Sequence, residues 1–122
     1  MRLRSARALP DAIIIGGLKC GTNTLHHCVV QHPQVIAPLR DEVHYFDAHH
    51  ALGERWYRAN FGRLDEPGLN LEHSPNYLFN PRAPTRARAL VPDARLVVLL
   101  RNPVRRAYWH YDFLDELVGF DL

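Results

Sequence analysis

The feature that most constrains the fold is a β-branched run that ends in glycine and leads into a helix. Residues 11–15 contain three consecutive isoleucines, a pattern typical of a short buried strand. Gly16 and Gly17 end this strand. A helix is expected over residues 24–31, because Pro33 disfavours helical backbone at the residue before it. Together these segments predict the first strand, turn and helix of an α/β fold.

The remaining elements alternate in the same way. Further strands are expected over residues 35–37, 69–72 and 94–100, and further helices over residues 53–61, 84–90 and 103–117. The run 94–100 is almost wholly apolar, so we expect both faces of that strand to be buried, as in a parallel sheet. The fold class is therefore α/β, with a P-loop-like parallel sheet flanked by helices.

Length, charge and cysteine content limit the partners and the compartment. The chain has 122 residues, enough for one domain, and residues 1–10 are expected to form a polar lead-in to it. A net charge of +2 suits an anionic ligand but is too weak for a nucleic-acid surface. No apolar run approaches the roughly 18 residues of a membrane span. Cys20 and Cys28 are too far apart on a helix for a disulfide, which favours a reducing, cytoplasmic setting; an upstream anchor or a Golgi origin stays open.

The turn between the first strand and helix predicts an anion-binding loop. Lys19 is the only lysine in the chain, and Gly21 allows close approach of a ligand to the backbone. The first N–H groups of the following helix have no intrahelical partner and carry partial positive charge. With the hydroxyl groups of Thr22 and Thr24, this loop suits a phosphate or a sulfate.

The same loop differs from the Walker A pattern of nucleotide-hydrolysing proteins. In that pattern a lysine follows the last glycine and a serine or threonine follows the lysine. Here Lys19 precedes Gly21, and no hydroxyl residue follows the lysine directly. A kinase acting on a nucleotide or a small molecule is therefore kept only as an alternative.

A second basic position follows the apolar strand at 94–100. Arg101 lies at the carboxyl end of that strand, where ligands bind in open α/β sheets. A guanidinium group at this point can hold a phosphate with two parallel hydrogen bonds. Pro103 then suits the first turn of the last helix.

These segments resemble the PAPS-dependent sulfotransferase family, in its heparan sulfate and bacterial branch; PAPS is 3′-phosphoadenosine 5′-phosphosulfate. Lys19-Cys-Gly-Thr-Asn-Thr-Leu25 resembles the family's 5′-phosphosulfate loop, and Arg101-Asn-Pro-Val-Arg-Arg-Ala107 resembles its 3′-phosphate motif. The resemblance implies that Arg101 holds the 3′-phosphate. It implies that the 5′-phosphosulfate is held by Lys19, Gly21, Thr22, Asn23 and Thr24.

One position departs from the 3′-phosphate motif. Trp109 occupies the place where the family usually has a serine that contacts this phosphate. Its indole N–H could donate a hydrogen bond in place of the hydroxyl group, or another donor could replace it. Trp109 is therefore included among the expected cofactor-binding residues, with weaker 3′-phosphate binding as the alternative.

Residues 41–47 resemble the stretch of the same branch that carries the proposed catalytic base. The resemblance implies that Glu42 removes the proton of the acceptor, with His44 as the second candidate. A positioned base typically contributes about 10²–10⁴-fold to such a step. Lys19 completes the expected catalytic set by offsetting charge on the transferred group.

Residues 71–77 resemble a further motif of the branch, Glu-Lys-Ser/Thr-Pro-x-Tyr. Glu72, Ser74, Pro75 and Tyr77 match it, and His73 replaces the lysine. Glu72 and His73 are therefore expected on the acceptor side. The other histidines, including His26, are expected at the surface or on a helix face, and no metal site is expected.

The resemblance implies an N-terminal portion of a sulfotransferase domain over residues 11–122, truncated at its C-terminal end, that transfers a sulfuryl group from PAPS. The acceptor would be a hydroxyl or amine of a small molecule or a carbohydrate. A weakly active or degenerate anion-binding fragment is the non-enzymatic alternative.

Overall fold

The computed structural model describes residues 6–118 and confirms the α/β class. The strands alternate with helices along the chain. In order, the elements are β1 (Ala12–Gly16), α1 (Thr22–Val29), β2 (Val35–Ile36), the 3₁₀ helix η1 (His50–Leu52), α2 (Glu54–Arg58), β3 (Leu69–His73), α3 (Ala83–Leu90), β4 (Arg95–Val98) and α4 (Pro103–Val118).

The strands form one parallel sheet with the order β2-β3-β1-β4. In this order β1 is central, paired with β3 on one side and β4 on the other. Parallel strands place their carboxyl ends at the same edge of the sheet. The segments that follow β1, β3 and β4 therefore meet there, and this edge is where ligands bind in open α/β sheets.

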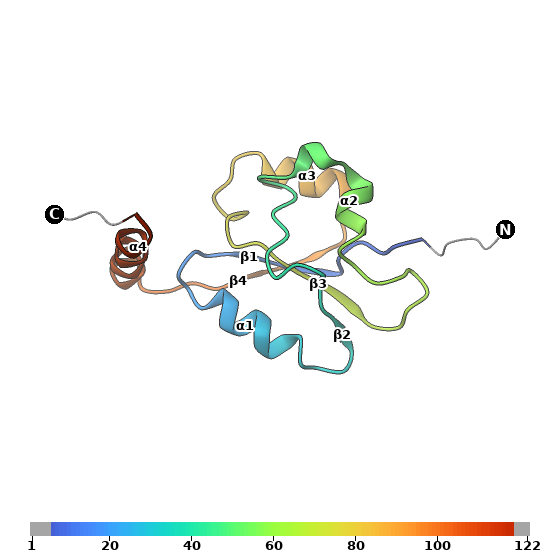
Figure 1. Cartoon of the computed structure of the whole chain (residues 1–122), viewed down its shortest axis with the longest axis horizontal. Helices are drawn as coiled ribbons and strands as arrows, with labels where there is room; N and C mark the ends of the chain where they lie inside the picture. The colour runs from blue at the N-terminus through green and yellow to red at the C-terminus, as the bar shows by residue number, and fades with distance from the viewer. Residues whose placement is uncertain (1–5, 119–122) are drawn as a thin grey trace.

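Helices cover the two faces of the sheet unequally (Figure 1). Helix α1 lies on one face, and α2 and α3 lie on the other. The core on the α2 and α3 side is aromatic, and the rings of Tyr45 and Tyr57 stack with centroids 4.3 Å apart. Its buried members also include Ile13, Val43, Phe46, Phe61, Tyr77, Ala83 and Val91.

The expectation that both faces of the 94–100 strand are buried is wrong. Leu96 is 59% exposed and Val98 is 40% exposed. The reason is position, because β4 is an edge strand with a neighbour on one side only. In addition, α4 lies beyond the carboxyl end of β4 and apart from the other helices, so it does not cover the sheet (Figure 1).

Part of the expected lead-in packs against the domain. Arg7 forms an isolated antiparallel bridge with Arg63, and the N–H of Ala8 donates to the carbonyl oxygen of Gly62 at 2.9 Å. Residues 1–5 of the lead-in lie outside the described residues. Between residues 6 and 118, every helix is too short or too polar to cross a membrane.

Candidate active site

The loop after β1 forms an open helix N-terminus. Helix α1 begins at Thr22, two residues earlier than the sequence predicts, so the expected cradle residues form its first turn. Gly21 is its N-cap in the left-handed conformation, with φ of 88°, and no side chain caps the helix. The first N–H groups of α1 therefore have no side-chain acceptor, which leaves them available for an anion.

A cleft of about 680 Å³ opens at this edge of the sheet. It brings together all the sequence-predicted site residues except Thr24 and Glu72. Those that line it are Lys19, Gly21, Thr22, Asn23, Glu42, His44, His73, Arg101 and Trp109. Thr24 is exposed on α1, outside the cleft lining.

The basic side of the cleft joins two distant loops. The Arg101 guanidinium group donates a hydrogen bond to the backbone carbonyl oxygen of Lys19 at 3.1 Å. The Lys19 ammonium nitrogen lies 3.2 Å from the ring centroid of Phe113 on α4. The Arg101 guanidinium carbon lies 5.8 Å from the ring centroid of Trp109, so both cations contact an aromatic face.

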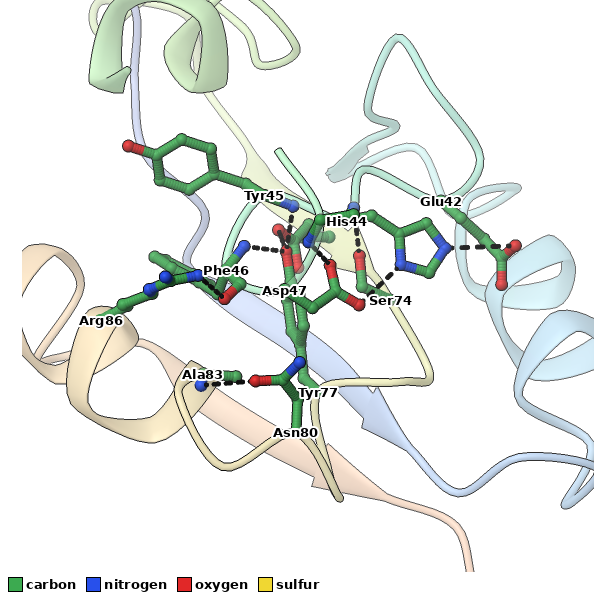
Figure 2. Close-up of polar contacts among 12 residues, drawn as sticks. Glu42, His44, Tyr45, Phe46, Asp47, Ser74, Tyr77, Asn80, Ala83 and Arg86 are labelled. Carbon is green, nitrogen blue, oxygen red and sulfur yellow. Dashed lines mark hydrogen bonds and ion pairs between the residues drawn. The ribbon is translucent and has the colours of Figure 1, made fainter. Parts of the chain in front are cut away.

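The opposite wall of the cleft carries a histidine held between two carboxylates (Figure 2). His44 Nδ1 lies 2.9 Å from Asp47 Oδ2, and His44 Nε2 lies 3.6 Å from Glu42 Oε2. The backbone N–H of His44 donates to Ser74 Oγ at 2.9 Å. His44 has φ of 52°, a conformation that is uncommon outside glycine, and these bonds hold it there.

Glu72 lies in the core and not in the cleft. Its Oε1 accepts hydrogen bonds from the hydroxyl groups of Tyr57 and Tyr77, both at 2.8 Å, and its Oε2 is buried without a hydrogen-bond partner. Burial raises the pKa of Glu72 to about 8, although the two hydroxyl donors oppose that shift. The hydroxyl oxygen of Tyr77 in turn accepts a hydrogen bond from the backbone N–H of Tyr45 at 2.8 Å. Glu72 is therefore connected to the 41–47 segment through Tyr77.

His73 follows Glu72 in β3 and therefore faces the opposite side of the sheet, where α1 lies. It is 1% exposed, lines the cleft, and stacks on His26 of α1. Of the two positions expected for His26, the helix face is confirmed and the surface is wrong, because His26 lies in α1 and is only 2% exposed. The reason is that α1 turns this residue toward the carboxyl end of β3.

Sequence reasoning missed several residues that shape the site. Asp47 lies three residues after His44, a spacing that could have suggested the contact. Phe113 could have been found only by knowing that α4 approaches the first loop. Asp112, Glu116 and Asn76 also line the cleft.

Two further observations bear on the chemistry. Cys20 and Cys28 are both free thiols, as expected. Among residues 6–118, no group of three or more histidine, cysteine or carboxylate side chains is placed to hold a metal ion.

The fold and the cleft define an α/β domain that presents an open helix N-terminus, a lysine and an arginine to an anion at the carboxyl edge of a parallel sheet. No protein-family model matches the chain. Individual proteins, however, are similar to it in sequence and in structure. Human heparan sulfate glucosamine 3-O-sulfotransferase 6 is 39% identical over 105 residues, which cover 86% of this chain and 30% of that protein.

Two more sulfotransferases are similar to the chain. The membrane-associated sulfotransferase kil1 of Dictyostelium discoideum is 35% identical over 108 residues, covering 86% of this chain and 23% of that protein. The crystal structure of a sulfotransferase from Alicyclobacillus acidocaldarius superposes with a TM-score of 0.78 at 30% identity, covering 89% of this chain and 51% of that chain. Over most of its length the chain belongs to the sulfotransferase family, and it spans only part of these relatives.

Proposed function

We propose that the cleft binds PAPS and supports transfer of its sulfuryl group to a hydroxyl or amine acceptor. The observation that carries the proposal is the meeting of Lys19, the uncapped N-terminus of α1 and Arg101 in one cleft. Such donors stabilise charge best when they are fixed before the ligand arrives. Family membership favours this function over the kinase alternative.

The two walls of the cleft have different roles: the basic wall binds PAPS, and the wall with Glu42 and His44 acts on the acceptor. The N–H groups of α1 and the Lys19 ammonium group bind the phosphosulfate end, and Arg101 binds the 3′-phosphate. When bound, PAPS supplies the activated sulfuryl group. Glu42 accepts the proton of the acceptor, and His44 orients Glu42 because its Nε2 lies 3.6 Å from the carboxylate.

A carbohydrate of the heparan sulfate type is the first acceptor to test. The human relative's name assigns it heparan sulfate glucosamine, and that relative matches 86% of this chain. The chain covers only 30% of that relative. The cleft described here therefore accounts only for acceptor contacts made by the matching part.

The experiment is a transfer assay that measures formation of 3′-phosphoadenosine 5′-phosphate (PAP) from PAPS with heparan sulfate as acceptor. Wild type is compared with Glu42→Gln and with Asp93→Asn, a matched acid-to-amide change at an exposed position outside the cleft. We expect Glu42→Gln to lower the acceptor-dependent rate about 10²–10⁴-fold and Asp93→Asn to preserve it. Equal rates in all three would remove Glu42 from the proposal.

A further inference from the structure

Two buried histidines on the α1 side of the sheet form a stacked pair behind the cleft wall. The ring centroids of His26 and His73 are 5.0 Å apart, with the ring planes 22° from parallel. His26 is 2% exposed and His73 is 1% exposed. His73 lines the cleft in which Lys19 and Thr22 also lie, whereas His26 lies behind it.

The hydrogen bonds of His73 determine which ring nitrogen carries its proton when the ring is neutral. His73 Nδ1 lies 3.3 Å from the backbone carbonyl oxygen of Asp41. A carbonyl oxygen can only accept, so Nδ1 must be the donor, and Nε2 of the neutral ring holds a lone pair. Nε2 is buried and has no partner, and so is Nδ1 of His26. Unpartnered buried nitrogens are uncommon, and at a ligand site they indicate a missing partner.

The burial of the two rings favours their neutral form. Burial lowers the pKa of both His26 and His73, and His73 lowers the pKa of His26 further. The charged and titratable groups that act on the pair, or line the cleft with His73, come from α1 and α4, from the 41–47 segment and from the two basic loops. They are His27, Asp41, Glu42, His44, Lys19 and Arg101, together with Asp112 and Glu116 of α4.

We propose that His73 is an anion-binding residue of the cleft that becomes a donor only when its Nε2 takes up a proton, and that His26 is its positioning residue. This inference rests on the proposed function, because the anion is the phosphate or sulfuryl end of the ligand. One proton moves from solvent to Nε2, and the new N–H donates to an anion oxygen. No other bond forms or breaks.

The stacked arrangement allows only one of the two rings to become charged when an anion binds. A protonated His73 is stabilised by an anion in the cleft, since opposite charge favours the charged form. A second proton on His26 would place two cations face to face, so His26 stays neutral and holds the plane of the His73 ring. Anion binding and proton uptake are therefore coupled. The factor by which protonation strengthens anion binding equals the factor by which the anion strengthens proton binding.

Inorganic sulfate is the probe, because it does not change its own protonation state near neutral pH. Sulfate affinity is measured by NMR between pH 6 and 8, at constant ionic strength with chloride as the balancing anion. We expect the affinity to fall at least about fivefold over this range, the lower end of typical coupling between sites. The imidazole resonances of His73 should titrate at higher pH with sulfate present than without it.

The variants separate the pair from its neighbours. His73→Gln should bind sulfate weakly at every pH. His73→Lys should bind it with less pH dependence than wild type, because the ordinary pKa of lysine, about 10.4, lies far above this range. His26→Gln should reduce the pH dependence. His32→Gln is the matched control at an exposed position outside the cleft and should behave as wild type. Backbone spectra of each variant check that it is folded.

The outcomes distinguish this inference from the proposed function. Sulfate binding that is saturable but equally strong at pH 6 and pH 8 would overturn the role of His73 and leave the anion site in place. If the affinity of His73→Gln for sulfate still depended on pH as in wild type, the role of His73 would likewise be overturned and the anion site would stay in place. Sulfate that binds no better than chloride at any pH would overturn the anion site itself, and this inference with it.

Discussion

Arg101 donates a hydrogen bond to the carbonyl oxygen of Lys19 at 3.1 Å, across 82 positions of sequence. The bond joins the segment after β4 to the loop after β1, which are neighbours because β1 and β4 pair in parallel. The bond thereby holds the Arg101 side chain beside the loop that carries Lys19, and both residues line one cleft. This arrangement is the structural basis of the proposed cofactor site.

The first prediction concerns the backbone of the anion loop. Gly21 has φ of 88° and an added Cβ would meet nothing within 4 Å, so Gly21→Ala acts through backbone strain. We expect about 1–2 kcal/mol loss in the free energy of unfolding, measured by urea denaturation, with weaker sulfate binding. Gly21→Asn should lose less stability, because asparagine tolerates this conformation better.

Gly53 provides the matched control for that prediction. It has φ of 87° and equally open space around its Cα, but it lies outside the cleft. Gly53→Ala should lose stability and keep its affinity for sulfate. If Gly21→Ala kept its affinity as well, the loop would not be the anion site.

The second prediction concerns the support of His44. Ser74 is fully buried and its Oγ accepts the backbone N–H of His44. Ser74→Ala leaves that N–H without a partner, so the free energy of unfolding should fall by about 1–3 kcal/mol. Thermal and urea denaturation measure the loss. Thr85→Ala, at an exposed hydroxyl on α3, should show no such loss.

The third prediction concerns stability as a function of pH. Burial raises the pKa of Glu72 from 4.5 to about 8, so the folded chain binds this proton more tightly than the unfolded chain does. The stability that depends on this proton is fully present below pH 4.5 and is lost as the pH rises to about 8.

Replacing Glu72 isolates that contribution. Glu72→Gln is neutral at every pH and its amide oxygen can still accept from the hydroxyl groups of Tyr57 and Tyr77. Unfolding free energies measured between pH 5 and 8 should fall less steeply in the variant than in wild type. Parallel curves would show that Glu72 does not titrate in this window.

Much of the fold was predictable because its signals are local. The isoleucine run of β1, the glycines after it and Pro103 at the start of α4 each act within a few residues. The exposure of β4 could not be predicted in this way. Whether Leu96 and Val98 are covered depends on strand order and on where α4 lies, and an apolar run looks the same at an edge as in the centre of a sheet.

The same distinction between local signals and tertiary packing applies to the site. The positions of Lys19 and Arg101 at the ends of two strands could be predicted, because parallel strands place their carboxyl ends together. The burial of Glu72 and the stacking of His26 on His73 could not. They depend on the faces of the sheet to which Glu72 and His73 point. Strand β3 is followed at once by an irregular segment, so no longer alternating pattern indicates those faces.

The most direct test of the proposed cofactor site is a calorimetric titration of the chain with PAP, with ADP as the control nucleotide. Lys19→Ala is compared with Arg88→Ala, which removes an exposed basic residue outside the cleft. We predict saturable binding of PAP by wild type and by Arg88→Ala, lost in Lys19→Ala and absent for ADP. A folded wild-type chain that binds neither nucleotide, or binds both alike, would contradict the account.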